Sequence, residues 1–166
     1  MAGRNAFGTK LYRSNGDDDW DQLSNATSID LPSLSREELD VTDHDSPDGY
    51  MEFIPGLRDG GEVSVECNYR PHRHDDWVME DYEDDDVHRY RIVLPTRGRH
   101  AWTFDAFVTA YEPSAPHDDK LEASITFKVS GKPDLSELGP GEGPGDGEDP
   151  GNGDGDNGDD ENGNDN

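Results

Sequence analysis

Two histidines and two aspartates lie close enough in the sequence to suggest a metal site. His72 and His74 are followed by Asp75 and Asp76, and imidazole and carboxylate groups are common zinc ligands. In an extended chain both imidazoles would lie on one side. A third ordered ligand is not evident, so we expect these residues to be solvated and predict no metal site.

A second acidic group, residues 152–160 (NGDGDNGDD), has the composition of a calcium-binding loop. Counting from Asp154, EF-hand position 5 falls on Gly158, and position 12 falls on Asp165 rather than on glutamate. The spacing of an EF-hand is therefore absent, and we expect only non-specific cation condensation. We predict no cofactor.

Catalytic groups do not stand out either. The chain has 40 acidic residues, so close pairs of carboxylates arise by chance, and no glycosidase-like pair can be singled out. Cys67 alternates with polar residues on the same side as Val63 and Val65, where a cysteine is a buried core residue rather than a nucleophile. No phosphate-binding glycine pattern is present. We therefore predict that the protein is not an enzyme.

The composition changes sharply near the end of the chain. Residues 139–166 are all Gly, Pro, Asn, Asp or Glu, and ten of them are acidic. Such a segment has no apolar side chain to bury, so we expect a disordered acidic extension. The rest of the chain keeps 30 acidic and 14 basic residues, and the whole chain has a formal charge of −26. A surface this acidic repels phosphate and argues against sequence-specific binding to nucleic acid.

Alternating apolar and polar residues predict a small all-β domain, a β-sandwich or flattened barrel of about six or more strands, with one short α-helix. We expect an N-terminal arm over residues 1–22, the β-domain over residues 23–138 and the extension over residues 139–166. Strands are expected at residues 27–31, 38–42, 62–69, 88–95, 101–111 and 121–129. The helix is expected at residues 75–82, capped by Asp75 or Asp76, with Val78, Tyr82 and Trp77 facing inward.

The strand at residues 101–111 changes phase along its length. Trp102 and Phe104 share one face, whereas Phe107, Thr109 and Tyr111 share the other. Two explanations remain open. Either both faces are covered, or a bulge near Asp105 and Ala106 resets the register.

Residues 43–61 form a segment rich in turn signals, Ser46-Pro47-Asp48-Gly49 among them. A long loop that carries apolar residues usually has a partner, and the alternative is that it folds back over its own core. We favour a contact loop, and its candidate residues are Asp43, Tyr50, Met51, Phe53, Ile54 and Leu57.

The sequence also bears on location. The first residues, MAGRNAFGTK, lack the apolar stretch of a secretory signal, and no run has the length of a membrane span. The single cysteine leaves no internal disulfide. We expect a protein made in the host cytoplasm with no membrane insertion.

Two stretches resemble the major tail tube protein of long-tailed (siphophage-type) phages. They are residues 28–69, SIDLPSLSREELDVTDHDSPDGYMEFIPGLRDGGEVSVECNY, and residues 101–135, AWTFDAFVTAYEPSAPHDDKLEASITFKVSGKPDL. The order of the blocks around one helix carries the resemblance, which covers roughly residues 23–135. Some relatives carry a folded immunoglobulin-like domain after the tube domain, whereas this chain has the acidic extension.

The resemblance implies a structural virion protein, located in the tail, that self-assembles into stacked hexameric rings. The rings would form a hollow tube through which viral DNA passes as cargo. It further implies ring-to-ring contacts through residues 43–61 and through terminal arms at residues 1–13 and 130–138. The implied partners are further copies of the chain and the tape measure, tail tip and tail terminator proteins.

Other classes of function remain open at this point. The nearest is a tube subunit of a related contractile or type VI-like injection system. A calcium-dependent β-sandwich binding module is a second, and would use the acidic residues. A glycan-cleaving enzyme would need a cleft with paired carboxylates, and a DNA mimic would not need the apolar residues within residues 43–61.

Overall fold

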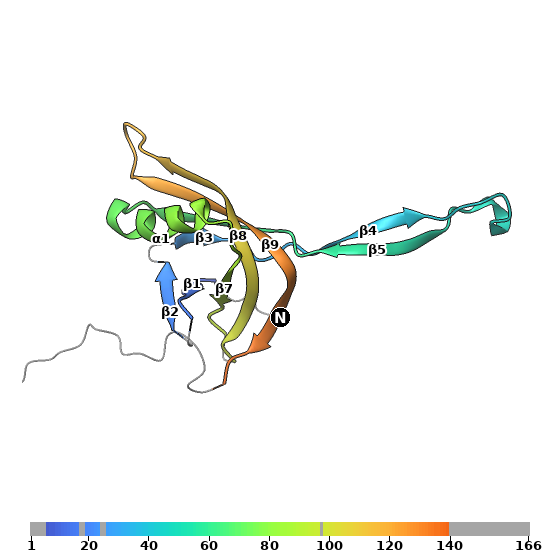
Figure 1. Ribbon diagram of the computed structural model, residues 1–166, viewed down its shortest axis with the longest axis horizontal. Helices are drawn as coiled ribbons and strands as arrows, with labels where there is room; N and C mark the ends of the chain where they lie inside the picture. Colours follow the sequence, from blue (N-terminus) through green and yellow to red (C-terminus); the bar gives the residue numbers. More distant parts are fainter. Residues whose placement is uncertain (1–5, 17–18, 24–25, 97, 140–166) are drawn as a thin grey trace, which may run out of the picture.

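A strongly curved antiparallel sheet forms the body of the protein (Figure 1). The computed structural model describes residues 6–16, 19–23, 26–96 and 98–139, with side-chain surroundings for all but residues 72–76. In this part of the chain the sheet has seven strands in the order β2-β1-β7-β8-β9-β6-β3. The strands are β1 (Lys10–Ser14), β2 (Trp20–Leu23), β3 (Ala26–Ile29), β6 (Glu62–Asn68), β7 (His88–Val93), β8 (His100–Ser114) and β9 (Glu122–Glu137).

Four further elements complete the described chain. The helix α1 (Pro71–Glu83) lies beside the sheet, and the strands β4 (Ser35–Asp40) and β5 (Phe53–Asp59) form a hairpin of their own. A short 3-10 turn, η1 (Pro47–Gly49), lies between those two strands. The predicted all-β class with one short helix is confirmed.

The two edges of the large sheet lie near each other. β2 ends at Leu23 and β3 begins at Ala26, yet these strands form opposite edges. Three Cα–Cα steps of about 3.8 Å each join these residues, so the edges approach within about 11 Å. The sheet therefore curls into a flattened barrel with a seam between β2 and β3. A cavity of about 410 Å³ opens at this seam, lined in part by Phe7, Leu23 and Ile29.

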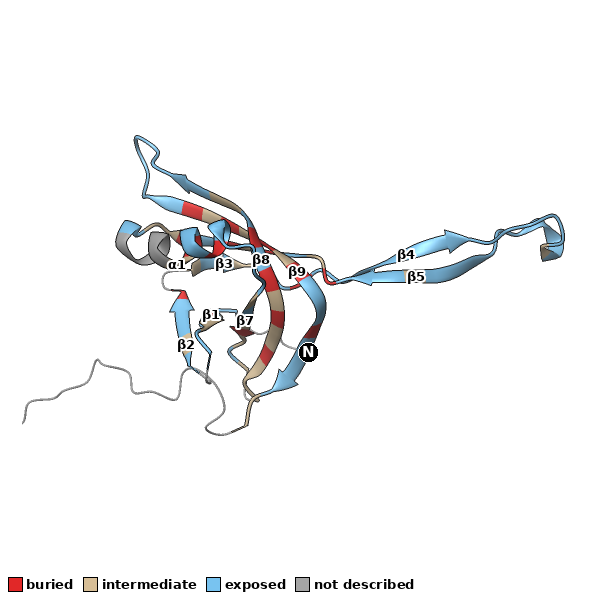
Figure 2. Cartoon of the chain, viewed as in Figure 1, coloured by how far each residue is buried: buried red, intermediate tan, exposed pale blue. Residues whose placement is uncertain are grey.

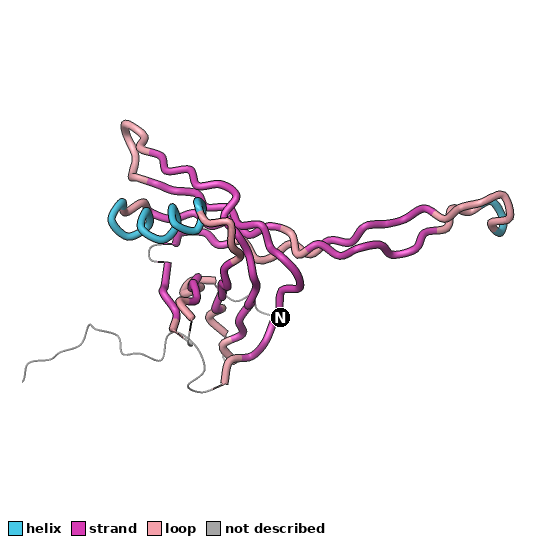
Figure 3. The backbone as a smooth tube through the Cα atoms, in the orientation of Figure 1, coloured by secondary structure: helices cyan, strands magenta, loops and turns pink. Residues whose placement is uncertain are grey.

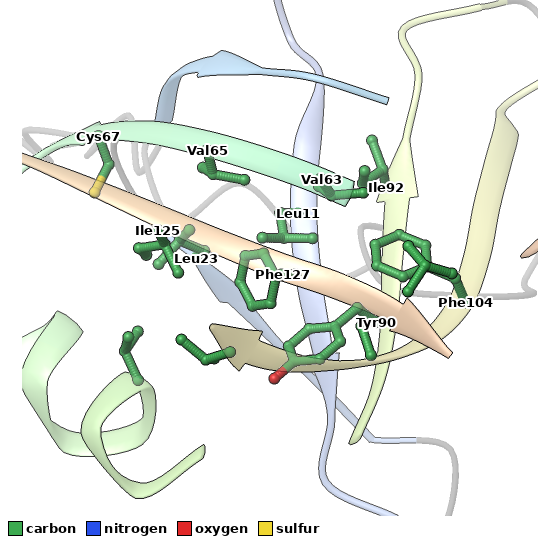
Figure 4. Close-up of a cluster of buried hydrophobic side chains, with 14 of the residues drawn as sticks. Leu11, Leu23, Val63, Val65, Cys67, Tyr90, Ile92, Phe104, Ile125 and Phe127 are labelled. Atoms are coloured by element: carbon green, nitrogen blue, oxygen red, sulfur yellow. The ribbon is translucent and has the colours of Figure 1, made fainter. Parts of the chain in front are cut away.

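Strict alternation on the central strands builds the core. In β6 the buried residues are Val63, Val65 and Cys67, and in β9 they include Ile125 and Phe127. Figure 4 shows these side chains pointing into a common interior. Full burial of each such aliphatic or aromatic side chain contributes about 1.5–3 kcal/mol to stability. This continuous cluster makes the body one folding unit.

Cys67 is a core residue, as predicted. Only 1% of its surface is exposed, and its thiol donates a 3.5 Å hydrogen bond to the backbone carbonyl of Ala123. Burial raises the pKa of the Cys67 thiol to about 11. The thiolate required for nucleophilic attack is therefore disfavoured at neutral pH.

The change of phase in β8 has a structural cause. The pairing of β8 with β9 shifts register between Thr103 and Asp105, and again between Val108 and Ala110. Between these shifts Phe104 is buried whereas Phe107 is 39% exposed. One register shift lies next to Asp105, where a bulge was one of the two explanations, but Phe107 still lies on the outer face, so the shift does not bring all the apolar residues of β8 to one face.

The helix differs from its prediction at both its start and its buried face. It begins four residues early, at Pro71, because proline fits the first helical position, where its missing N–H has no partner to lose. The N-cap is Arg70 and makes no side-chain capping bond, so the predicted aspartate cap is wrong. Val78 is buried as expected, but Tyr82 is 52% exposed.

The position expected of Tyr82 is taken by a charged residue. Asp81 is 1% exposed, and its carboxylate accepts a 2.6 Å hydrogen bond from the Tyr90 hydroxyl on β7. Arg13 of β1 donates a hydrogen bond to the other carboxylate oxygen. This buried cluster joins the helix to two strands of the sheet, and its polar partners are what make burial of the charge tolerable.

Parts of the expected terminal arms lie within the sheet. Residues 10–14 and 20–23 are strands β1 and β2, and β9 continues to Glu137 beside the start of β8. Leu11 and Leu23 are buried in the core. Their strands do not alternate in the sequence, because Leu11 and Tyr12 are adjacent in β1 and Trp20 and Leu23 are three residues apart in β2. No helix in the described ranges is long and apolar enough to cross a membrane.

Candidate interaction surface

The hairpin of β4 and β5 projects from the body, and we call residues 35–59 the arm. Figures 1 and 3 show it extending away from the curved sheet, with strands along most of its length. The sequence predicted a strand at residues 38–42 followed by a turn-rich loop. The structure instead pairs Ser35 with Asp59 and Asp40 with Phe53. The arm is therefore an antiparallel ribbon whose two strands are joined by residues 41–52 at its tip.

The predicted turn at Pro55-Gly56 lies inside β5. A register shift falls between Arg36 and Glu38 of β4, opposite this part of β5. β5 has no second neighbour in its sheet, so the missing N–H of Pro55 costs no pairing. The signal that predicted a turn thus marks an irregularity in an edge strand.

The apolar candidates all lie on the arm and are exposed, as Figure 2 shows. Their exposed fractions are 74% for Tyr50, 62% for Met51, 52% for Phe53, 48% for Ile54 and 81% for Leu57. Burial against the chain's own core, the alternative for this segment, is not what the structure shows. Whether these residues bind a partner stays a prediction.

Two exposed residues of the arm were missed. Leu39 and Val41, in the strand expected at residues 38–42, are each 43% exposed. Their alternation with Glu38 and Asp40 is that of a half-buried strand. Alternation in the sequence could not show that this strand lies in the projecting arm rather than in the body.

The tip of the arm is braced by its own hydrogen bonds. The Ser46 hydroxyl donates to the Glu52 carboxylate at 2.7 Å and accepts from the Asp43 N–H at 3.1 Å. The Glu52 N–H donates to the Thr42 hydroxyl at 2.8 Å. Asp43 therefore shapes the tip through its backbone N–H, and its carboxylate accepts a further bond from the Asp45 N–H at 2.8 Å.

Two glycines hold the base of the arm close to the body. Gly61 has φ +76°, and a Cβ atom built there would lie 2.0 Å from the backbone oxygen of Ser33. At Gly60 a Cβ atom would lie 2.6 Å from a methyl group of Val129. The Gly61 carbonyl also accepts a 3.0 Å hydrogen bond from the Val129 N–H. Only glycine allows this approach and this backbone conformation.

An ion pair completes the base. The Lys128 ammonium on β9 donates to both carboxylate oxygens of Asp59 at 2.9 Å. The Gly61 N–H donates to the same carboxylate at 2.8 Å. The Lys128 contact, followed by the Gly61 N–H, lowers the pKa of Asp59 below its usual value. The direction in which the arm leaves the body is thus set by a charged contact and a tight backbone contact.

Sites for chemistry do not assemble in the described part of the chain. No group of three or more His, Cys, Asp or Glu residues there could hold a metal ion. The side chains of His72, His74, Asp75 and Asp76, and all of residues 152–160, lie outside the described residues. The arm is therefore the feature that distinguishes the surface.

The comparisons with known proteins agree with this geometry. The family model described as "Lambda phage tail tube protein, TTP" matches residues 5–136. The chain belongs to this tail tube protein family. No curated protein matches it by sequence.

Several solved structures have the same fold as this tail tube protein. One, titled "Tail of empty GTA particle computed with helical refinement, C6 symmetry", is 16% identical with a TM-score of 0.67, covering 82% of this chain and 100% of that chain. A chain of the SPP1 tail tube is 14% identical with a TM-score of 0.57, covering 78% and 76%. A chain of an extracellular contractile injection system, "PVC sheath/tube terminator in extended state", is 12% identical with a TM-score of 0.62, covering 82% and 98%.

The function class follows from the family. This tail tube protein is a structural component of the virion and belongs to the phage tail. Its sheet supplies the body of the subunit, and its arm presents apolar surface beyond that body.

Proposed function

We propose that the chain closes into hexameric rings, that the rings stack into the hollow tail tube, and that the arm makes the contacts between rings. Viral DNA passes through the tube as cargo. Tyr50, Met51, Phe53, Ile54 and Leu57 are the apolar contact residues, and Asp43 holds the shape of the tip. On this proposal the protein acts by assembling into the tube and does not catalyse a reaction.

The exposed arm is the observation that carries the proposal. A two-stranded hairpin is marginally stable in water by itself, and contiguous exposed apolar surface marks an interaction site. The arm has both properties along its length. Burial of this surface against other subunits would stabilise the arm and the tube together.

The proposed partners beyond the tube itself are the tape measure protein inside it, the tail tip at one end and the terminator at the other. Residues 140–166 of the acidic extension lie outside the described residues. Within the arm expected at residues 1–22, β1 and β2 are strands of the sheet, and residues 1–5 lie outside the described residues.

Paired substitutions of the same residue types test the proposal. Tyr50→Ser and Met51→Ser remove apolar surface from the arm, and Tyr82→Ser and Met79→Ser remove it from the helix, where the parent residues are 52% and 38% exposed. Loss of one buried side chain of this size costs about 1.5–3 kcal/mol, so the arm variants should raise the critical concentration for tube growth about tenfold or more. The helix variants should leave it near the parent value.

Negative-stain microscopy and sedimentation of the full chain give the readout. Tubes that form equally well from the arm variants and the parent would count against the arm as the contact between rings. Failure of the helix variants alone would place the contact elsewhere on the body.

A second candidate is the tube of a contractile system. The fold is shared with chains of extracellular contractile injection systems at TM-scores of 0.58 to 0.62. Microscopy of particles that contain this protein distinguishes the two, since a contractile particle carries a sheath around the tube. A bare tube supports the siphophage-type tail.

A further inference from the structure

We propose that the exposed side of helix α1 binds a different protein through a segment of that protein that is apolar along one stripe and rich in lysine or arginine beside it. We call the exposed side chains within residues 79–87 the helix patch. The helix patch is separate from the arm, so this inference does not depend on the proposed contact role of the arm. It rests on the side chains that the helix leaves uncovered and on the charge around them.

The helix is anchored to the body by its other side. Val78 is fully buried, and Trp77 packs against the core. The buried carboxylate of Asp81 adds polar bonds to two strands of the sheet. The attachment of the helix is therefore complete without the residues of the helix patch.

Three apolar side chains of the helix patch are uncovered. Met79 and Tyr82 are three residues apart on the helix, so their side chains are neighbours, and they are 38% and 52% exposed. Val87, in the chain that leaves the helix, is 48% exposed. Methionine adapts to varied partner shapes, and tyrosine is enriched in protein interfaces. These side chains form an apolar stripe suited to a protein partner.

Carboxylates surround this stripe. The exposed acidic residues of the helix patch are Glu80, Glu83, Asp84, Asp85 and Asp86. No lysine or arginine occurs within residues 77–88. The Arg13 guanidinium lies 3.9 Å from Glu80 but pairs more closely with the buried Asp81. The helix patch is therefore apolar in its middle and acidic at its edges.

This charge decides which class of partner fits. Nucleic acids and anionic membranes carry phosphates, which an acidic surface repels. The arm of another copy, residues 35–59, carries eight acidic residues and two arginines, so it is repelled as well. A polypeptide with lysines or arginines beside an apolar stripe complements both parts of the helix patch. We therefore identify the occupant as a basic amphipathic segment of a different protein.

Each part of such a segment has a place on the helix patch. Its apolar side chains cover Met79 and Tyr82, and a lysine or arginine lies over the Tyr82 ring. Its other cations pair with the carboxylates, which also steer its approach. Figure 1 shows the helix on the side of the body away from the arm. A partner can therefore reach the helix patch without displacing the arm.

Fluorescence anisotropy with two labelled peptides tests the inference on the full, unassembled chain. One peptide contains only leucine and lysine, spaced so that the leucines form one helical stripe, and the other has serine in place of each leucine. At about 0.15 M salt the chain should bind the leucine–lysine peptide about tenfold more tightly or better. Equal affinity for the two peptides would show that only overall charge is recognised, and would overturn the inference.

Matched apolar substitutions locate the binding site. Met79→Ser with Tyr82→Ser removes the stripe, and Met51→Ser with Tyr50→Ser removes the same residue types from the arm. The helix variant should bind the leucine–lysine peptide about tenfold more weakly, and the arm variant should bind like the parent. Urea unfolding of both should be unchanged, because the replaced side chains are exposed. A helix variant that binds like the parent would overturn the inference.

Matched acidic substitutions test the charged edge. Asp85→Asn with Asp86→Asn removes two charges from the helix patch, and Asp118→Asn with Asp119→Asn removes two from the exposed turn between β8 and β9. Both variants have the same net charge. The first should weaken binding of the leucine–lysine peptide about two- to fivefold, and the second should have little effect. Equal losses would overturn the placement of the partner on the helix.

Tube growth separates this inference from assembly. Because the partner is a different protein, Met79→Ser with Tyr82→Ser should leave the critical concentration for tube growth near the parent value. Loss of tube growth in this variant, with its affinity for the peptide unchanged, would assign the helix patch to contacts between copies and overturn the inference.

Discussion

The Tyr90 hydroxyl donates a 2.6 Å hydrogen bond to the carboxylate of Asp81, inside the body of the subunit. Tyr90 is fully buried, and its ring lies 4.8 Å from that of Phe127, centroid to centroid. Arg13 approaches the same carboxylate from β1. Burial, followed by the bond to Asp81, raises the pKa of Tyr90 far above its usual value, so the hydroxyl remains a donor. The helix is thereby joined to the sheet by one buried acid.

Asp81→Ala should therefore be strongly destabilising. The substitution leaves the Arg13 guanidinium without its buried counter-charge and the Tyr90 hydroxyl without its acceptor. Removing one partner of a buried pair costs about 3–5 kcal/mol, which urea unfolding followed by circular dichroism will measure. Asp84→Ala is the matched control, because the Asp84 side chain is 41% exposed. Equal effects of the two changes would show that the buried cluster contributes no special stability.

The close contacts at the base of the arm predict that a change to alanine costs more stability at Gly61 than at Gly131. Gly61 and Gly131 have nearly the same backbone angle, with φ +76° and +78°, but only a Cβ atom at Gly61 meets other atoms within 4 Å. Gly131→Ala should cost about 1–2 kcal/mol for the left-handed backbone alone. Gly61→Ala should cost about 2 kcal/mol more, because the Ser33 backbone must move. Denaturant unfolding of both variants checks this, and similar losses would refute the steric explanation.

The ion pair between Asp59 and Lys128 predicts that the contribution of Asp59 to stability decreases at low pH. Lys128, followed by the Gly61 N–H, holds the pKa of Asp59 below its unfolded value, so the contribution of Asp59 to stability is present above the unfolded pKa. It is lost as the pH falls through the folded pKa. An NMR titration of the Asp59 carboxyl carbon should show its midpoint rise in Lys128→Met. Lys120→Met, whose parent lysine pairs with Glu122, should leave the midpoint unchanged.

Cys67 predicts how the subunit responds to thiol reagents. Its thiol is buried and its pKa is raised to about 11, so at pH 8 it should react with an aromatic disulfide only when the body opens. In urea sufficient to unfold the chain the reaction should be fast, since the pKa of an unfolded cysteine is about 8.5. Fast labelling of the native subunit would show that β6 and β9 separate more readily than their packing suggests.

The charge of the chain predicts that salt favours assembly. Each subunit carries a net charge of −26, and the screening length falls from about 10 Å at 0.1 M salt to about 3 Å at 1 M. Tube growth followed by light scattering should therefore accelerate as salt is raised. The chain ending at Leu138 lacks ten of the acidic residues and should need less salt. Growth that does not respond to salt in either chain would exclude repulsion as a barrier.

Most of the body could be predicted because its strands alternate over seven or more residues. β6 and the inward positions of β9 were recognised from alternation, and so was the burial of Cys67. β1 and β2 were not recognised because their apolar residues do not alternate: Leu11 and Tyr12 are adjacent, and Trp20 and Leu23 are three residues apart. Asp81 was missed because a carboxylate is buried only when distant residues, here Arg13 and Tyr90, lie beside it.

The sequence identified the residues of the arm as unusual, but it did not predict their secondary structure. The apolar content of residues 50–57 identified an unusual segment, and the structure places those residues on an exposed ribbon. Pro55 and Gly56 signal turns in most contexts, and only the absence of a second neighbour beside β5 allows them inside a strand. The turn preferences of Pro55 and Gly56 could not reveal that β5 lacks a second neighbouring strand in its sheet.

The order of strands in the curved sheet also governs when the protein can fold during its synthesis. β1 pairs with β7, whose first residue is His88, and β3 pairs with β6 only after the whole arm has been translated. The ribbon of residues 35–59, in contrast, needs only itself and can close as soon as Asp59 leaves the ribosome. Neighbouring nascent chains on one messenger therefore expose the apolar residues of the arm before any of them has a finished body.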